Sequence, residues 1–201
     1  FYFGENSHVE QHEETFLISI KRMLPKWMNS IPDSEFLALH RLINKYCQEG
    51  TVLVETGVGA STILFAYHAM KKSGKIFSWD TNAEKASHIR TVCVETISNY
   101  FKKDINLHWS FVNSISTSEH SGLKILHELK TPVDFFFHDS HHVLDTIAAE
   151  IDAIAPAMTR GGIICMDDAN YNFRSINETF IHVVTKKLGP LSIHPIEVST
   201  C

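Results

Sequence analysis

The 201-residue chain contains no long hydrophobic run and no long run of basic residues. A membrane-spanning helix needs about 18 or more consecutive apolar residues, and no stretch of the sequence approaches that length. The formal net charge is −5, which argues against nucleic acid or an anionic membrane surface as the main partner. The sequence therefore predicts a protein that binds neither membranes nor nucleic acids.

Cysteines are few, and their positions match neither a zinc site nor a disulfide framework. The four are scattered along the chain, at Cys47, Cys93, Cys165 and Cys201. We interpret them as free thiols in a reducing compartment, and no signal peptide is apparent, so a cytoplasmic location is expected. The first residue, Phe1, is not methionine, which suggests a chain trimmed at its front.

The composition, with 44% hydrophobic and 20% charged residues, is that of a globular domain. Residues 1–48 differ from the rest, because they contain two helical patterns and no strand-like block. Residues 14–24 place Phe16, Ile20 and Met23 at helical spacing, and residues 33–47 have Asp33 or Ser34 as N-cap. We predict an N-terminal helical extension over 1–48, followed by one domain over 49–201.

From Thr51 onward, short apolar blocks alternate with helical patterns. The predicted strands are 51–55, 75–79, 106–112, 133–137, 162–166 and 191–198, and the predicted helices are 61–72, 82–101, 117–129, 143–157 and 175–188. This alternation predicts an α/β fold with a doubly wound, mostly parallel, Rossmann-like sheet. Ligands of such sheets bind beyond the carboxyl ends of the strands, so the residues that follow each strand are the candidate site.

The stretch "VETGVGAST" (54–62) joins the first strand to the first helix, and Gly57 and Gly59 allow a tight turn there. Asp80 ends the second strand, which is where an acid holds a ribose diol in NAD and S-adenosylmethionine sites alike. Two features favour S-adenosylmethionine. Thr62 replaces the third glycine of the dinucleotide fingerprint, and Glu55 would repel a pyrophosphate but suits an amino group and a sulfonium.

Three carboxylates follow the fourth and fifth strands. Asp139 lies in "FFFHDSHH" (135–142), and Asp167 and Asp168 follow "GGIICM" (161–166). Neighbouring parallel strands would bring these acids to one edge of the sheet, where they cannot all stay ionised without a cation or protons. Clustered carboxylates suit a hard divalent ion, Mg²⁺ first. Of the nearby histidines, we expect His138 to be a hydrogen-bonded core residue and His142 to be functional.

In these motifs the chain resembles the class I S-adenosylmethionine-dependent methyltransferases, over about residues 46–198. The resemblance implies that Asp80 holds the ribose hydroxyls and that Ser114, after the third strand, lies beside the adenine. It also implies which residues surround the methionine part of the cofactor: Glu55, Gly57, Gly59 and Ser61.

The spacing of Asp139, His142, Asp167 and Asp168 resembles the metal-dependent O-methyltransferases. The macrocin and mycinamicin sugar type is nearer than catechol O-methyltransferase, because the base is a histidine and the second acid pair is Asp-Asp. The resemblance implies a divalent metal held by the three acids and His142 as general base for the hydroxyl of a small-molecule acceptor, a sugar or a catechol-like compound.

Two alternative functions remain open at this point. One is a metal-dependent oxygenase on the same scaffold, resembling proteins named for cephalosporin hydroxylation, since His and Asp ligands can bind iron. The other is a non-catalytic module that keeps the cofactor fold. Class I methyltransferases usually add a seventh strand that this sequence does not show, so we expect either a longer native chain or a homodimer that covers the sheet edge.

Overall fold

The computed structural model describes residues 6–167, with side chains from residue 11 onward. Five strands form one sheet: β1 Val52–Thr56, β2 Lys75–Asp80, β3 Trp109–Asn113, β4 Val133–His138 and β5 Met158–Met166. Their order is β3-β2-β1-β4-β5, and every pairing is parallel. The predicted doubly wound parallel sheet is confirmed. The predicted strand 191–198 and helix 175–188 lie outside the described residues.

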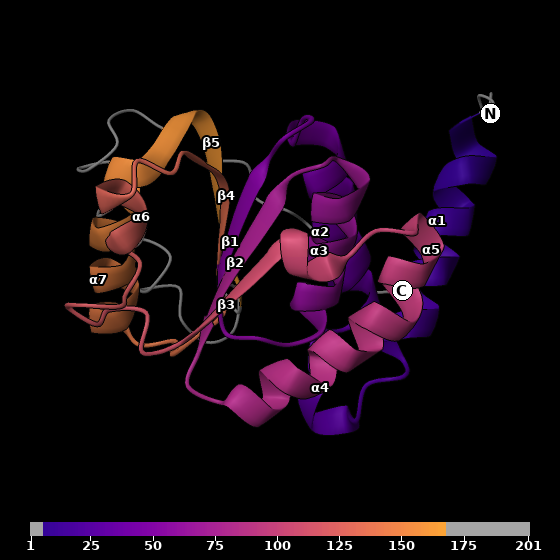
Figure 1. Cartoon of the computed structure of the whole chain (residues 1–201), viewed down its shortest axis with the longest axis horizontal. Helices are drawn as coiled ribbons and strands as arrows, with labels where there is room; N and C mark the ends of the chain where they lie inside the picture. Colours follow the sequence, from indigo (N-terminus) through magenta and orange to yellow (C-terminus); the bar gives the residue numbers. More distant parts are fainter. Residues whose placement is uncertain (1–5, 168–201) are drawn as a thin grey trace.

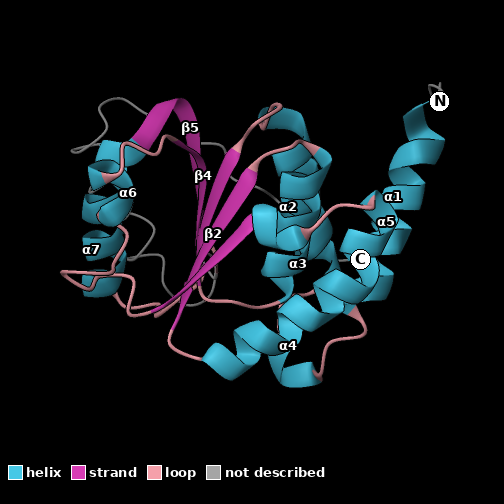
Figure 2. Ribbon diagram, viewed as in Figure 1, coloured by secondary structure: helices cyan, strands magenta, loops and turns pink. Residues whose placement is uncertain are grey.

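Helices cover both faces of the sheet (Figures 1 and 2). The α-helices are α1 Asn6–Lys21, α2 Asp33–Tyr46, α3 Ala60–Lys71, α4 Ala83–Cys93, α5 Asn99–Phe101, α6 Ile125–Glu128 and α7 Leu144–Ile154. Short turns of other helix types are η1 Lys26–Met28, η2 Val94–Ser98, η3 Ile105–Leu107 and η4 Ala155–Ala157. In Figure 1, α6 and α7 lie on one side of the sheet and α1 to α5 on the other.

Side-chain alternation along the strands divides the core into two clusters. Leu53 and Phe135 face α3, whereas Val54 and Phe136 face α7. The central helix α3 is buried almost throughout. The same alternation directs Glu55 toward α3 and the next residue, Thr56, toward α7. The end of β1 therefore presents a polar side chain to each face of the sheet.

The N-terminal helices belong to the same core as the sheet. Leu17 of α1 and Phe36 of α2 are fully buried in the cluster that includes α3. The helix predicted over 14–24 ends at Lys21, so Met23 is 53% exposed instead of continuing the buried face. Asp33 does not cap α2, because its carboxylate pairs with Lys21 at 2.7 Å instead. The division between residues 48 and 49 stays a prediction.

Two further predicted elements differ from the structure. The helix over 117–129 is reduced to α6, because a tight serine-rich turn precedes it, in which the backbone N–H of Gly122 donates to the carbonyl of Ser118. A Cβ at Gly122 would lie 2.4 Å from that carbonyl oxygen, so the turn requires glycine. The helix predicted over 82–101 is helical throughout but contains the π-turn η2. No described helix is long and apolar enough to cross a membrane.

Candidate functional site

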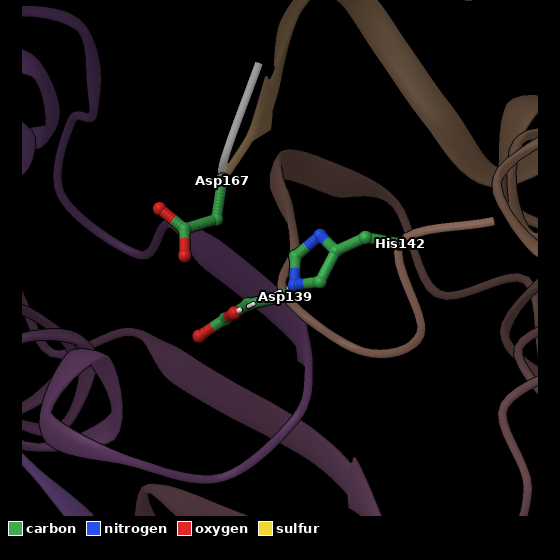
Figure 3. Close-up of side chains that lie close together, drawn as sticks. All are labelled: Asp139, His142 and Asp167. Atoms are coloured by element: carbon green, nitrogen blue, oxygen red, sulfur yellow. Dashed lines mark ion pairs between the residues drawn. The ribbon is translucent and has the colours of Figure 1, made fainter. Parts of the chain in front are cut away.

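Asp139, His142 and Asp167 converge at the carboxyl ends of β4 and β5 (Figure 3). Each of the three offers one ligand atom, and these atoms all lie within 4.8 Å of one another. The Nε2 atom of His142 is 3.7 Å from Oδ1 of Asp139. The predicted meeting of Asp139 with Asp167 is therefore present in the fold. Asp168 lies outside the described residues.

Strand pairing explains how residues 28 positions apart in the sequence meet. In the parallel pairing of β4 with β5, His138 is the partner of Met166, so the residues that follow both strands leave the sheet side by side. The backbone N–H of Asp167 donates to the carbonyl of His138 at 3.0 Å. Backbone pairing alone is thus enough to bring the two acids to neighbouring positions at the ends of β4 and β5.

The electrostatics of this cluster favour a cation. Burial raises the pKa of Asp139 well above its ordinary value, and the neighbouring carboxylate of Asp167 raises it further, while Lys85 acts in the opposite direction. Two carboxyl groups this close share a proton or a positive charge. The site stays open on one side, because the side chain of Asp139 is 28% exposed and that of His142 is 30% exposed. A divalent ion would fit the donor set and relieve the repulsion.

The three neighbouring histidines differ in their surroundings. His138 is fully buried, and its Nδ1 lies 2.5 Å from a carboxylate oxygen of Glu150, as expected for a core residue. His141 is exposed. The sequence predicts His142 one helical turn beyond Asp139, but α7 begins only at Leu144. His142 therefore lies in the connecting loop, and loop geometry rather than a helix face separates it from His141.

The glycine loop, residues 57–59 between β1 and α3, packs directly against the acid loop, residues 139–143 between β4 and α7. Gly57 has a positive φ of 89°, and a Cβ there would lie 1.9 Å from the carbonyl oxygen of Asp139. Gly57 is thus required by the close approach of two strand ends, which the sequence did not reveal. Thr62 also has a structural explanation, because its hydroxyl accepts the backbone N–H of Gly59 at 3.0 Å.

Glu55, near the end of β1, is fully buried, and its side chain lies against α3. One of its oxygens accepts the Ser61 hydroxyl at 3.0 Å, and the other accepts the Ser78 hydroxyl at 2.6 Å. Burial raises the pKa of Glu55 to about 7, although the serine and threonine hydroxyls around it lower the value. Its predicted contact with the methionine part of the cofactor stays a prediction, as does that of Ser61.

Asp80 is the last residue of β2, and Ser114 directly follows β3, as the sequence predicted. The carboxylate of Asp80 accepts the backbone N–H of Val58 at 2.8 Å, so it also anchors the glycine loop. The hydroxyl of Ser114 lies 2.6 Å from that of Ser121. Their roles toward ribose and adenine stay predictions.

Glu150, a buried carboxylate in α7, is not among the residues that the sequence predicted for the site. A signal was present in the helical spacing, because Ile147, Glu150, Ile151 and Ile154 occupy one buried face. An acid inside such an apolar stripe indicates a specific partner, since an unpaired buried charge is costly. The partners themselves, described below, come from three strand ends and could not be predicted from spacing.

Comparisons with known proteins show the family and the fold of the chain. Residues 54–169, more than half of the chain, match a family profile described as "Methyltransferase domain". No curated protein sequence matches the chain. The chain is similar to the solved apo structure of CalS11, named as a TDP-rhamnose 3'-O-methyltransferase of calicheamicin biosynthesis, with a TM-score of 0.63 and 17% identity over 97% of this chain and 92% of that one.

A second solved structure of CalS11, described as a calicheamicin methyltransferase, gives a TM-score of 0.61 and 16% identity, covering 97% of this chain and 91% of that one. At these identities the likeness to CalS11 concerns the fold, whereas the match to the family profile concerns the sequence. The matched range contains the glycine loop, Asp80 and the acids after β4 and β5. The chain therefore belongs to the methyltransferase domain family, as its resemblance to the S-adenosylmethionine-dependent methyltransferases implied.

Proposed function

We propose that this chain is a divalent-metal-assisted O-methyltransferase that transfers a methyl group from S-adenosylmethionine to a hydroxyl of a sugar-containing small molecule. The observation that carries the proposal is the grouping of Asp139, His142 and Asp167 within 4.8 Å. This group of residues lies beside the glycine loop, which follows β1 and leads into α3, as the cofactor loop does in Rossmann-like sheets. A sugar acceptor is favoured over a catechol because the similar structure CalS11 is named for methylation of a TDP-sugar.

The residues of the cluster divide the chemistry between them. Asp139 and Asp167 would hold the ion, with Asp168 as a further predicted ligand. When bound, a divalent ion lowers the pKa of an acceptor hydroxyl and orients it. His142 would take the hydroxyl proton as general base, because its Nε2 lies 3.7 Å from Oδ1 of Asp139, beside the proposed ion. The remaining contribution of the protein is to hold the acceptor oxygen in line with the methyl group of the cofactor.

The donor set argues against the oxygenase alternative. Non-haem iron oxygenases bind their metal through two histidines and one carboxylate. The cluster formed by the described residues has two carboxylates, which the proposal assigns to the ion, and a single histidine, which it assigns to the base, while His141 is exposed. Oxygen-rich sites of this kind prefer Mg²⁺ or Mn²⁺.

The test compares two neighbouring histidines and one acid. His142→Ala should reduce methyl transfer to a panel of nucleotide sugars by about 10²–10⁴-fold and retain Mn²⁺ binding. His141→Ala, the matched control, should behave like the wild type. Asp139→Asn should lose both Mn²⁺ binding and activity. Retained metal in Asp139→Asn, or a dead His141→Ala beside an active His142→Ala, would contradict the assignment. Catechols are assayed in parallel with the wild type, and turnover of catechols without turnover of any nucleotide sugar would show that the acceptor class is wrong.

A further inference from the structure

The carboxylate of Glu150 contacts side chains from several of the segments that carry the site. Oε2 accepts the Thr56 hydroxyl at 2.9 Å and faces Nδ1 of His138 at 2.5 Å. Oε1 accepts the Ser140 hydroxyl at 2.7 Å and also the Ser116 hydroxyl. Glu150 itself is 0% exposed. One side chain of α7 therefore bonds to groups that follow or end β1, β3 and β4.

This arrangement is not explained by stability alone. The positions around Glu150 on the same helix face are isoleucines, and an aliphatic side chain in place of a buried ionic group is often neutral or stabilising. Burial by itself would raise the pKa of Glu150, but the hydrogen bonds from His138, Ser116 and Ser140 outweigh it and the pKa is lowered. The carboxylate is thus kept ionised by its donors, as expected of a charge that holds defined groups in place.

The donors flank the residues that the proposed function uses. Thr56 directly precedes Gly57 of the glycine loop, while His138 and Ser140 lie on either side of Asp139. The backbone ties the same points together, because the N–H of Asp139 donates to the carbonyl of Thr56 at 2.9 Å. A shift of the Glu150 carboxylate would therefore be transmitted to the glycine loop and to the acid loop at once.

His138 extends this support to the predicted base. With Nδ1 facing Glu150, its Nε2 is buried and has no hydrogen-bond partner among the described residues. The rings of His138 and His142 pack edge to face, with centroids 5.7 Å apart and planes at 87°. The orientation of the His142 ring thus depends on a ring that Glu150 fixes.

We infer that Glu150 is a positioning residue. It holds the glycine loop, through Thr56, and the acid loop, through His138 and Ser140, in their positions relative to each other. The inference rests on the proposed function for what those loops bind. Glu150 would touch neither cofactor nor acceptor. Outer residues that orient metal ligands typically change metal affinity by about 10–100-fold when they are substituted.

The first experiment needs no ligand. Glu150→Gln keeps the side-chain volume but removes the charge and leaves one acceptor oxygen for four donors. The matched control is Asp134→Asn, a part-buried carboxylate at the opposite end of β4 that accepts the Val52 N–H and the Thr159 hydroxyl, both at 2.9 Å. Amide hydrogen exchange should accelerate over 54–60 and 138–143 in Glu150→Gln, and near Val52 in Asp134→Asn.

The second experiment titrates the purified full chain with Mn²⁺, followed by electron paramagnetic resonance, and with S-adenosylhomocysteine, followed by calorimetry. Glu150→Gln should weaken Mn²⁺ binding by about 10–100-fold and also weaken cofactor binding, while Asp134→Asn should bind both ligands as the wild type does. Ser140→Ala should weaken Mn²⁺ more than the cofactor, and Thr56→Val the reverse. These two variants decide the matter if Glu150→Gln does not fold.

Wild-type affinities and wild-type exchange in Glu150→Gln would overturn the inference. So would equal losses of affinity in Glu150→Gln and Asp134→Asn, because a general loss of stability would then explain both. A wild-type chain that binds neither probe would overturn the proposed function instead. The exchange comparison would in that case still decide whether Glu150 holds the two loops.

Discussion

Gly57 lies where the glycine loop packs against the backbone of Asp139. An added Cβ would combine two costs, a positive φ that disfavours side chains and a 1.9 Å approach to the backbone oxygen of Asp139. We expect Gly57→Ala to lower the free energy of unfolding by about 2–4 kcal/mol. Chemical denaturation followed by circular dichroism measures this change.

Gly59 is the natural control for that substitution. It lies two residues away in the same loop, its backbone is extended, and a Cβ there would meet nothing closer than the Met28 carbonyl oxygen at 3.6 Å. Gly59→Ala should cost about 1 kcal/mol or less. Equal effects at the two glycines would mean that the two loops are not packed as described.

At the scale of elements, a buried histidine pair joins α2 to α3. Nδ1 of His40 lies 3.0 Å from Nε2 of His68, and such a contact requires at least one neutral ring. Burial lowers the pKa of both, well below the ordinary value for His68. Glu13 of α1 and Lys71 of α3, paired at 2.7 Å, are among the charges that act on the pair, together with Glu14, Arg41 and Lys72.

This pair predicts a loss of stability in acid. Both pKa values are depressed on folding, so the unfolded chain binds protons first as the pH falls below about 6.5. The two histidines therefore make their full contribution to the free energy of unfolding above that pH, and this contribution decreases as the pH falls below it. Glu55 has the opposite sign, because its raised pKa of about 7 makes folding less favourable as the pH rises. Variants must therefore be compared with the wild type over the same pH range.

Urea denaturation between about pH 5 and pH 7 provides that comparison. In His68→Leu the part of the pH slope that comes from His68 should vanish, whatever the absolute stability of the variant, while the part that comes from the burial of His40 remains. His127→Gln, at an exposed histidine of α6, should keep the wild-type slope. An unchanged slope in His68→Leu would show that His68 does not titrate on unfolding.

At the scale of the whole molecule, cofactor binding should stabilise the fold, because only the folded chain brings the glycine loop and Asp80 together at the carboxyl ends of β1 and β2. A ligand present at 100 times its dissociation constant adds about 2.7 kcal/mol to the free energy of unfolding. For a chain of this length that corresponds to a rise in Tm of about 5–10 °C. S-adenosylhomocysteine should produce this rise in a thermal scan, and NAD should not.

The variant Asp80→Asn refines the same measurement. It should reduce the rise in Tm that S-adenosylhomocysteine causes, since one charge-assisted hydrogen bond contributes about 1.5–3 kcal/mol. A larger rise with NAD than with S-adenosylhomocysteine would contradict the cofactor assignment. Indifference of the S-adenosylhomocysteine effect to Asp80→Asn would contradict the role of this acid.

The sequence by itself determined which polar residues end the strands of this protein. Parallel strands are recognisable as apolar blocks, and the residues that follow them must leave the sheet at one edge. Asp80, Asp139 and Asp167 could therefore be placed at the carboxyl ends of their strands from the sequence alone, and the turn residues of the glycine loop were equally readable. Helix ends were less so, since Asp33 pairs with Lys21 instead of capping, and the serine-rich turn before α6 shortens a predicted helix.

Only the tertiary structure decided how the strand ends are held together. The clash that makes Gly57 necessary lies 82 residues away in the chain, at Asp139, and no local pattern encodes such an approach. The donors to Glu150 are distributed over three strand ends, so their convergence depends on the order of strands in the sheet and on the placement of α7. Helical spacing could show that Glu150 is buried, but contacts between distant segments are fixed by packing, and these contacts determine what the carboxylate does.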